Sequence, residues 1–126
     1  MEKVVIDPDP YEPFRLSQAI RHADLLYVSG QAGIDGKGSL PDTFDAQAHQ
    51  AFANLSKVLV AGGSDLTRVI KVTIFVRDMA ATFDTVVSLR EQYFTPPYPA
   101  DSIVEVSSLY SPRALFEIEA VAIAGH

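Results

Sequence analysis

Two acidic residues in the last third of the sequence are placed where a carboxylate could do chemistry. Asp101 follows a proline-rich turn and precedes an apolar run, in the stretch PPYPADSIVEV at residues 96–106. Glu117 lies in the alternating stretch LFEIEAVAI. A carboxylate beside a strand is either a solvated surface group or a group that transfers protons. Each residue taken alone is typical of an exposed position, so other features of the chain are needed to choose.

Other kinds of catalytic group have little support in this sequence. The chain has no cysteine, which excludes disulfides, thiolate nucleophiles and thiolate metal ligands. The histidines are scattered over a turn, a helix face and the terminus (His22, His49, His126). No serine has an identifiable histidine base, and the glycines between residues 30 and 38 do not form a phosphate loop. We therefore expect no metal site, no hydrolase triad and no phosphate loop.

The composition predicts a single domain over residues 1–126. A chain of this length with 48% hydrophobic residues can bury a real core. Its formal net charge of −6 argues against binding to nucleic acid or to an anionic membrane surface. No apolar stretch approaches the roughly 20 residues of a membrane span, and the N-terminus lacks a secretory signal pattern. These features favour a cytoplasmic protein.

The first half of the chain is expected to contain strands and one helix. Strands are predicted at residues 3–6, 15–20 and 25–30, with the segment DPDPYEPF as a connection because proline fixes φ and lacks an N–H. Apolar residues then recur at helical spacing up to Gly62 and Gly63, which supply the stop. Asp42 or Thr43 is the expected N-cap of this helix.

The second half repeats the pattern of strand, helix and strands. A strand is expected at residues 68–76, and a helix begins after Asp78 and ends before the prolines at 96–97. Strands at residues 102–110 and 114–125 close the chain. Tyr27 and Phe75 are expected in the core, as is the apolar side of the second helix (Met79, Phe83, Val86, Val87, Leu89, Tyr93, Phe94).

This order of elements predicts an α+β domain with two helices on one face of a mixed sheet. Alternation in the last strand places one set of residues toward the helices (Phe116, Ile118, Ala120, Ala122). A second, partly apolar set lies on the face that the helices leave open (Leu115, Glu117, Glu119, Val121, Ile123). Self-association is the simplest way to cover these apolar groups.

Six stretches of the chain resemble the RidA/YjgF family, also called endoribonuclease L-PSP, in order and spacing. They are LSQAI, LLYVSGQAGID, QAFANLSKVLVAGG, VIKVTIFVRDMA, YPADSIVEV and LFEIEAVA. The resemblance implies a chorismate-mutase-like fold that assembles as a homotrimer, with a central barrel of sheets and small-molecule clefts between subunits. It also implies enamine or imine deaminase chemistry that needs no cofactor.

The resemblance assigns roles to particular residues, and several depart from the family pattern. The family's carboxylate-binding arginine is replaced by Asp101, its active-site tyrosine by Leu16, and an asparagine near the ligand by Val87. Glu117 matches the glutamate that positions the attacking water. The other candidate ligand-binding residues are the turn at Ser29, Gly30 and Gln31, whose backbone groups line the family's cleft, and Ile103 beside the Asp101 stretch. Arg15 is a further candidate because it is adjacent to Leu16 and could supply a displaced positive charge.

Arginine suits a carboxylate because its planar fork of donors binds both oxygens. Asp101 would instead repel a carboxylate substrate, so hydrolysis of 2-aminoacrylate is not expected. If Asp101 and Glu117 share a cleft, their repulsion should raise one pKa and give a paired acid and base. The same pair could instead select a cationic or neutral polar ligand, or weakly hold a hard metal ion, which is the least favoured because such ions want more oxygen ligands. The alternatives are a non-catalytic ligand-binding or chaperone-like trimer, and a ribonuclease, which conflicts with the net charge of −6.

Overall fold

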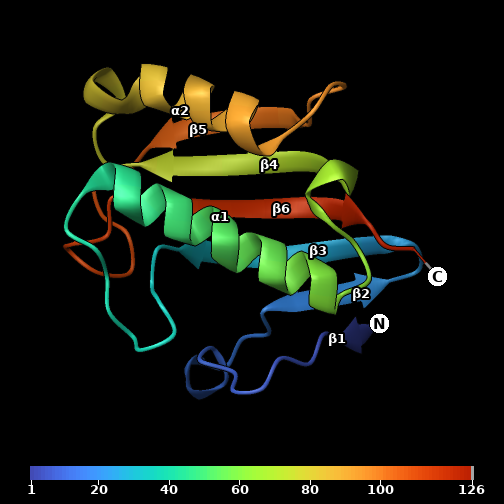
Figure 1. The fold of residues 1–126 in the computed structure, drawn as a ribbon. Coiled ribbons are helices and arrows are strands. Elements are labelled where there is room, and N and C mark those ends of the chain that lie inside the picture. Colours follow the sequence, from blue (N-terminus) through green and yellow to red (C-terminus); the bar gives the residue numbers. More distant parts are fainter. Residues whose placement is uncertain (126) are drawn as a thin grey trace.

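Two helices pack against one face of a six-stranded mixed sheet in the computed structural model, which describes residues 1–125 (Figure 1). The strand order is β1-β2-β3-β6-β4-β5. Only β4 and β5 run parallel, and every other neighbouring pair is antiparallel. The strands are β1 (Glu2–Lys3), β2 (Ala19–His22), β3 (Leu25–Ala32), β4 (Val69–Val76), β5 (Ala100–Glu105) and β6 (Phe116–Ile123). The expected α+β class is confirmed.

Both long helices begin at side-chain caps that the sequence predicted. α1 (Phe44–Ala61) starts where the Thr43 hydroxyl accepts from the Ala46 amide, and it ends at Gly62. α2 (Met79–Tyr93) starts where the Asp78 carboxylate accepts from the Ala81 amide. These caps satisfy N–H groups that the first turn of a helix leaves free. Two short 3-10 helices complete the described elements, η1 (Glu12–Phe14) and η2 (Leu66–Arg68).

The core lies between the sheet and the helices. Strand β6 sends alternate side chains into it, as predicted, and α1 covers the centre of the sheet (Figure 1). Neither α1, α2 nor any other helix within residues 1–125 has the length and apolar character that a bilayer crossing requires. The largest fully buried apolar side chains come from α1, the central strands and one position of α2 (Phe52, Leu55, Val58, Leu59, Leu26, Val72, Ile74, Val76, Phe116, Ile118, Val86).

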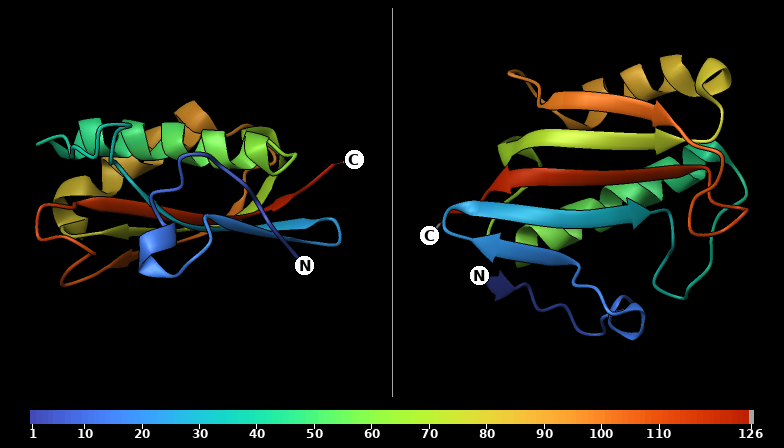
Figure 2. Two further views of the ribbon diagram at one scale, coloured as in Figure 1. Left: turned by 90° about the horizontal axis from the view of Figure 1, so that it is seen from below. Right: turned by 180° about the vertical axis from the view of Figure 1, so that it is seen from behind.

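Helix α2 buries less of its apolar side than the sequence predicted. Val86 and Leu89 are buried, whereas Phe83 and Val87 are each 44% exposed. The helix runs along the outer edge of the sheet beside β5, so only a narrow stripe meets the core (Figure 2). Met79 and Tyr93 are partly buried against the core and Phe94 is buried, so Phe83 and Val87 are the members of the predicted apolar side that lie on the outer surface.

Neither α1 nor α2 covers the opposite face of the sheet, and the segment that contains η1 reaches it only at one edge (Figure 2). Apolar side chains on it are partly open to solvent: Tyr27 is 47% exposed and Ile123 41%. Phe75, on the same face, is half-buried. The prediction that Tyr27 and Phe75 belong to the core was wrong, because their strand positions alternate away from the helices.

Several boundaries also differ from the prediction. Strand β2 covers Ala19–His22 where residues 15–20 were expected, and β5 starts two residues earlier and ends at Glu105. The proline-rich connection contains η1, whose first turn holds a proline. Proline is compatible with that position because its missing N–H would be unpaired there in any case. This connection passes the edge of the sheet near the end of β3, where the candidate site lies.

Candidate functional site

The site is built on a β-bulge in β3. Val28 pairs with Ala120 of β6, and Gln31 pairs with Ile118, so β3 has one more residue than β6 in this interval. Ser29 and Gly30 form the bulge. The turn expected at residues 29–31 is therefore an irregularity inside a strand that continues to Ala32. Bulges locally bend and twist a strand, and they often redirect groups at functional sites.

Glu117 lies directly against this bulge, on the open face of the sheet. In the β4–β6 ladder it pairs with Phe75, and in the β3–β6 ladder with Ala32. A Cβ atom placed on Gly30 would lie 2.3 Å from the Glu117 Oε2 atom. The carboxylate therefore occupies the space that any other residue at position 30 would fill. Glycine at this position is a steric requirement of the site.

The environment of Glu117 favours its protonated form. Burial raises the pKa of this carboxyl above its ordinary value, and the negative charge of Glu119 raises it further. Glu117 takes part in none of the ion pairs found within residues 1–125. A half-buried carboxyl with a raised pKa has the properties of a general base or acid.

Two tyrosines that the sequence did not identify flank Glu117. The Tyr11 hydroxyl donates a 2.6 Å hydrogen bond to the carbonyl oxygen of Gly30. The pKa of Tyr11 is raised to about 12, mainly by burial and next by the negative charge of Glu117. Burial and Glu117 also raise the pKa of Tyr110, in the loop between β5 and β6. Tyr11 belongs to the proline-rich connection, where it is one of two aromatic residues, with Phe14, and no sequence pattern distinguished it.

The predicted ligand-binding residues near the bulge differ in what they offer. The Ser29 hydroxyl donates to the Ser17 carbonyl at 2.6 Å, and buried Gln31 donates its amide to the Ser29 carbonyl at 3.2 Å. Both side chains stabilise the bulge itself. The exposed Arg15 lines an open hollow with Asp9, Glu12 and Pro13, and Leu16 is 43% exposed.

Asp101 lies on the other face of the sheet from Glu117. It pairs with Val72 in the β4–β5 ladder, on the side that faces the helices, where its Oδ2 atom accepts from Arg90 Nε of α2 at 2.7 Å. Its Oδ1 atom is buried without a hydrogen-bond partner among residues 1–125. The expected pairing of Asp101 with Glu117 is therefore not formed within one chain. The alternation of strand residues separates them.

Two other predicted site residues, Ile103 and Val87, lie on the helix side of the sheet, as Asp101 does. Ile103 lies on the same face of β5 and packs against the core, and Val87 is on the outer surface of α2. The predicted site residues thus form two groups within one chain. One group surrounds the bulge (Ser29, Gly30, Gln31, Glu117), and the other lies at β5 and α2 (Asp101, Ile103, Val87).

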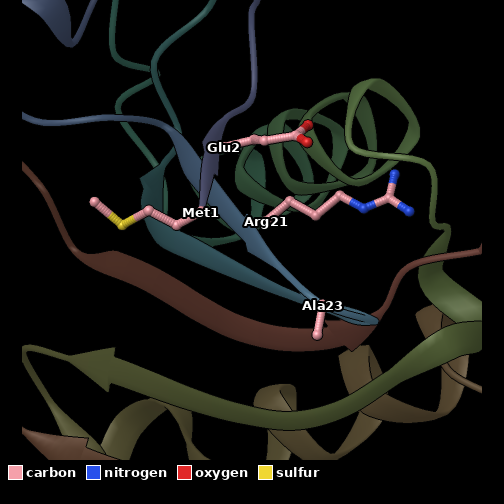
Figure 3. A pocket seen from close by; sticks show the side chains of 4 residues that line it. All are labelled: Met1, Glu2, Arg21 and Ala23. Atoms are coloured by element: carbon pink, nitrogen blue, oxygen red, sulfur yellow. The ribbon is translucent and has the colours of Figure 1, made fainter.

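A second hollow lies away from these groups. It is lined by Met1, Glu2, Arg21 and Ala23, near the turn between β2 and β3 (Figure 3). It contains none of the predicted site residues. Within residues 1–125 no three histidine, cysteine or acidic side chains converge as a metal site, and His126 lies outside the described residues.

Comparisons with known proteins agree with the fold. The family model for endoribonuclease L-PSP matches residues 7–124. A human 2-iminobutanoate/2-iminopropanoate deaminase is 39% identical over 111 residues, which cover 86% of this chain and 80% of that protein. RidA from an Antarctic Psychrobacter bacterium superposes with a TM-score of 0.90 at 29% identity, over 98% and 99% of the two chains. A Thermotoga maritima structure described as a putative endoribonuclease gives 0.89 at 33% identity, over 100% and 99%.

Proposed function

The chain belongs to the endoribonuclease L-PSP family, which includes RidA, and on this premise we propose that it hydrolyses a small imine or enamine without a cofactor. The observation that carries the proposal is the Glu117 carboxyl, half-buried against Gly30 with a raised pKa. The deaminase activity named for the human relative belongs to the same chemical class. The absence of cysteine suits a reducing compartment, and we place the protein in the cytoplasm.

Glu117 is the proposed proton acceptor and donor for water. As the water oxygen bonds to the carbon of a protonated imine, one water proton passes to the Glu117 carboxylate. The same proton is then returned to the nitrogen of the tetrahedral adduct. The carbon–nitrogen bond breaks, the adduct's hydroxyl proton leaves with the departing ammonia, and the products are a carbonyl compound and ammonium. Backbone groups at Gly30 and Gln31 are the proposed anchor for the substrate oxygen or carbonyl.

We propose that the substrate has no free carboxylate, unlike 2-aminoacrylate or 2-iminobutanoate. Glu117 and Glu119 contribute negative charge to the bulge side of the site. On the other side, Asp101 occupies the position of a carboxylate-binding arginine and engages Arg90 in an ion pair. A carboxylate substrate would meet the negative charge of Glu117 and Glu119 on one side and, on the other, an arginine already paired with Asp101, which is unfavourable. A neutral or cationic imine fits this charge pattern.

The two groups of site residues support a cleft between subunits of a homotrimer. Glu117 lies on the open face, and Asp101, Ile103 and Val87 lie on the helix side. A second copy of the chain is needed to bring both groups to one ligand. The uncovered face and the exposed apolar residues of α2 are surfaces on which such a copy would pack. Asp101 would then reach the ligand from the neighbouring subunit as an acid or amine-binding group.

Ammonia release tests the proposed substrate class directly. The protein is added to 2-aminoacrylate generated by a pyridoxal-phosphate enzyme, to 2-iminobutanoate, and to imines of matched size without a carboxylate. We expect acceleration only for the imines without a carboxylate, and we expect Glu117→Gln to abolish it. Robust turnover of 2-aminoacrylate would contradict the role assigned to Asp101. Full activity of Glu117→Gln would remove Glu117 from the mechanism.

Exchanging the charges of the ion pair tests the specificity argument. The double variant Asp101→Arg with Arg90→Asp keeps opposite charges in contact, at 2.7 Å in the native pair, but places the guanidinium on β5. We expect this variant to gain activity toward imines that carry a carboxylate. Arg90→Asp alone removes the cation without replacing it and is the control. Equal substrate preference in all three proteins would refute the assignment.

A non-catalytic trimer that binds a small ligand or acts as a chaperone is the second candidate. It is favoured by the three departures from the family pattern, Leu16, Val87 and Asp101. Ligand binding by the wild-type protein without accelerated hydrolysis of any imine would support it. Ribonuclease activity, which the family's description suggests, is disfavoured because a net charge of −6 repels RNA phosphates.

A further inference from the structure

The connection between β1 and β2 is anchored at its start, where Val4 is buried and Ile6 packs against the core. Its later apolar side chains provide little attachment, since Phe14 is 75% exposed and Leu16 43%. Polar contacts attach its middle instead. The Tyr11 hydroxyl donates to the Gly30 carbonyl of β3 at 2.6 Å, and Asp9 pairs with Lys3 of β1 at 3.5 Å. Within the connection, the Tyr11 amide donates to Asp9 Oδ1 at 2.9 Å.

Gly30 is contacted on two sides by groups of the site. Its carbonyl oxygen accepts from Tyr11, and the space beside its Cα is filled by the Glu117 carboxylate. Tyr11 and Glu117 come from distant parts of the sequence and meet at this one residue. Both side chains are at least partly buried, and the negative charge of Glu117 helps to raise the pKa of the Tyr11 hydroxyl.

We propose that Tyr11 is a positioning residue for Glu117: its hydroxyl, bound to the Gly30 carbonyl, holds the proline-rich connection over the bulge and shields the carboxyl from water. This inference rests on the proposed function for its catalytic consequence. A phenylalanine would bury the same ring, but it would leave the Gly30 carbonyl without this donor. The hydroxyl is therefore the feature that links the connection to the site.

The proposal predicts how Glu117 responds when Tyr11 is removed. In Tyr11→Ala the carboxyl becomes more hydrated, and since burial is the main cause of its raised pKa, that pKa should fall toward the ordinary value of 4.5. Carbon-13 NMR of protein labelled at glutamate carboxyls measures this, with Glu117→Gln assigning the signal. Tyr98→Phe, at an exposed position before β5, is the control and should leave the titration unchanged. An unchanged Glu117 titration in Tyr11→Ala would overturn the proposal.

Tyr11→Phe keeps the ring and removes only the hydroxyl, so it answers the same question if the alanine variant does not fold. Loss of one hydrogen bond should make opening of the connection about fivefold more frequent. Trypsin should then cleave after the exposed Arg15 about fivefold faster than in the wild type. Equal cleavage rates in the two proteins would also overturn the proposal.

Turnover adds a third readout that separates this proposal from the proposed function. If the wild type hydrolyses an imine, Tyr11→Ala should shift the acidic limb of its kcat/KM profile to lower pH, because the base loses its proton at lower pH. An unshifted limb would count against Tyr11. If the wild type hydrolyses no imine, the proposed function fails, and the NMR titration still decides whether Tyr11 positions Glu117.

Discussion

At the scale of single residues, Gly30 is the position on which the candidate site depends most directly. Gly30→Ala would place a methyl group 2.3 Å from Glu117 Oε2, so the carboxylate must move away. Because the clash is with the end of a flexible side chain, we expect the fold to survive and activity to fall by on the order of 100-fold. Ammonia release measures the loss, and circular dichroism checks the fold.

Gly36→Ala is the matched control for this substitution. Gly36 lies in the loop before α1, and an added Cβ would meet no atom within 4 Å. We expect wild-type activity and unchanged or slightly increased stability, because alanine reduces the freedom of the unfolded chain. Wild-type activity in Gly30→Ala would show that the contact with Glu117 is not needed.

The charged form of the Glu117 carboxyl should lower the stability of the fold, although the proposed reaction requires this carboxyl. Its folded-state pKa lies above the ordinary value of 4.5, so stability falls as pH rises from that value through the folded-state pKa. Glu117→Gln removes the charge and should therefore have a higher Tm than the wild type at pH 7. The difference should shrink below pH 4.5, where both states of the wild type are protonated. Thermal melts at the two pH values measure it, and a lower Tm at pH 7 would contradict the burial argument.

At the scale of elements, a buried amide on α1 connects the helix to two loops, the one that precedes α1 and the one that precedes β6. Gln47 donates to the carbonyls of Pro41 and Arg113 at 2.8 and 2.9 Å, and its oxygen accepts from the Leu115 amide at 2.8 Å. These contacts position the segment that enters β6 just before Glu117. Glutamine is usually found at exposed positions, yet Gln47 is 1% exposed.

Gln47→Met keeps the shape of the side chain but leaves three backbone groups without partners. Unpaired buried polar groups are costly, so we expect a loss of roughly 3 kcal/mol in the free energy of unfolding. Chemical denaturation measures it. Gln92→Met, at an exposed position of α2, is the control and should change stability by less than about 0.5 kcal/mol. A comparably small effect at Gln47 would mean that water replaces these hydrogen bonds.

At the scale of the whole molecule, the uncovered face of the sheet should be an interface. We expect sedimentation to give a mass three times the 13.7 kDa of one chain. Val104→Asp places a charge on that face and should dissociate the assembly, because an unpaired buried carboxylate is unfavourable. Val60→Asp, on an exposed position of α1, is the control and should leave the mass unchanged. A stable wild-type monomer would contradict the intersubunit cleft.

Local chemistry in the sequence determined the element types, the helix caps and the inward face of β6. Thr43, Asp78 and Gly62 act through neighbouring residues, and strand alternation has a fixed period, so these features can be read without a structure. The position of Glu117 on the open face followed from the same alternation. The resemblance in six stretches supplied the family and the fold, which the comparisons confirmed.

Only the tertiary structure decided which side chains meet. Strand β5 has too few apolar residues for their alternation to show that Asp101 faces the helices. The contact of Asp101 with Arg90 also depends on how α2 lies along the edge of the sheet. The bulge at Ser29 and Gly30 adds one residue to β3 relative to β6, which appears only when the two strands are paired. Tyr11 reaches that bulge from 19 residues away, through a connection with no periodic pattern to predict its path. Contacts of this kind depend on chain geometry, which residue types alone do not specify.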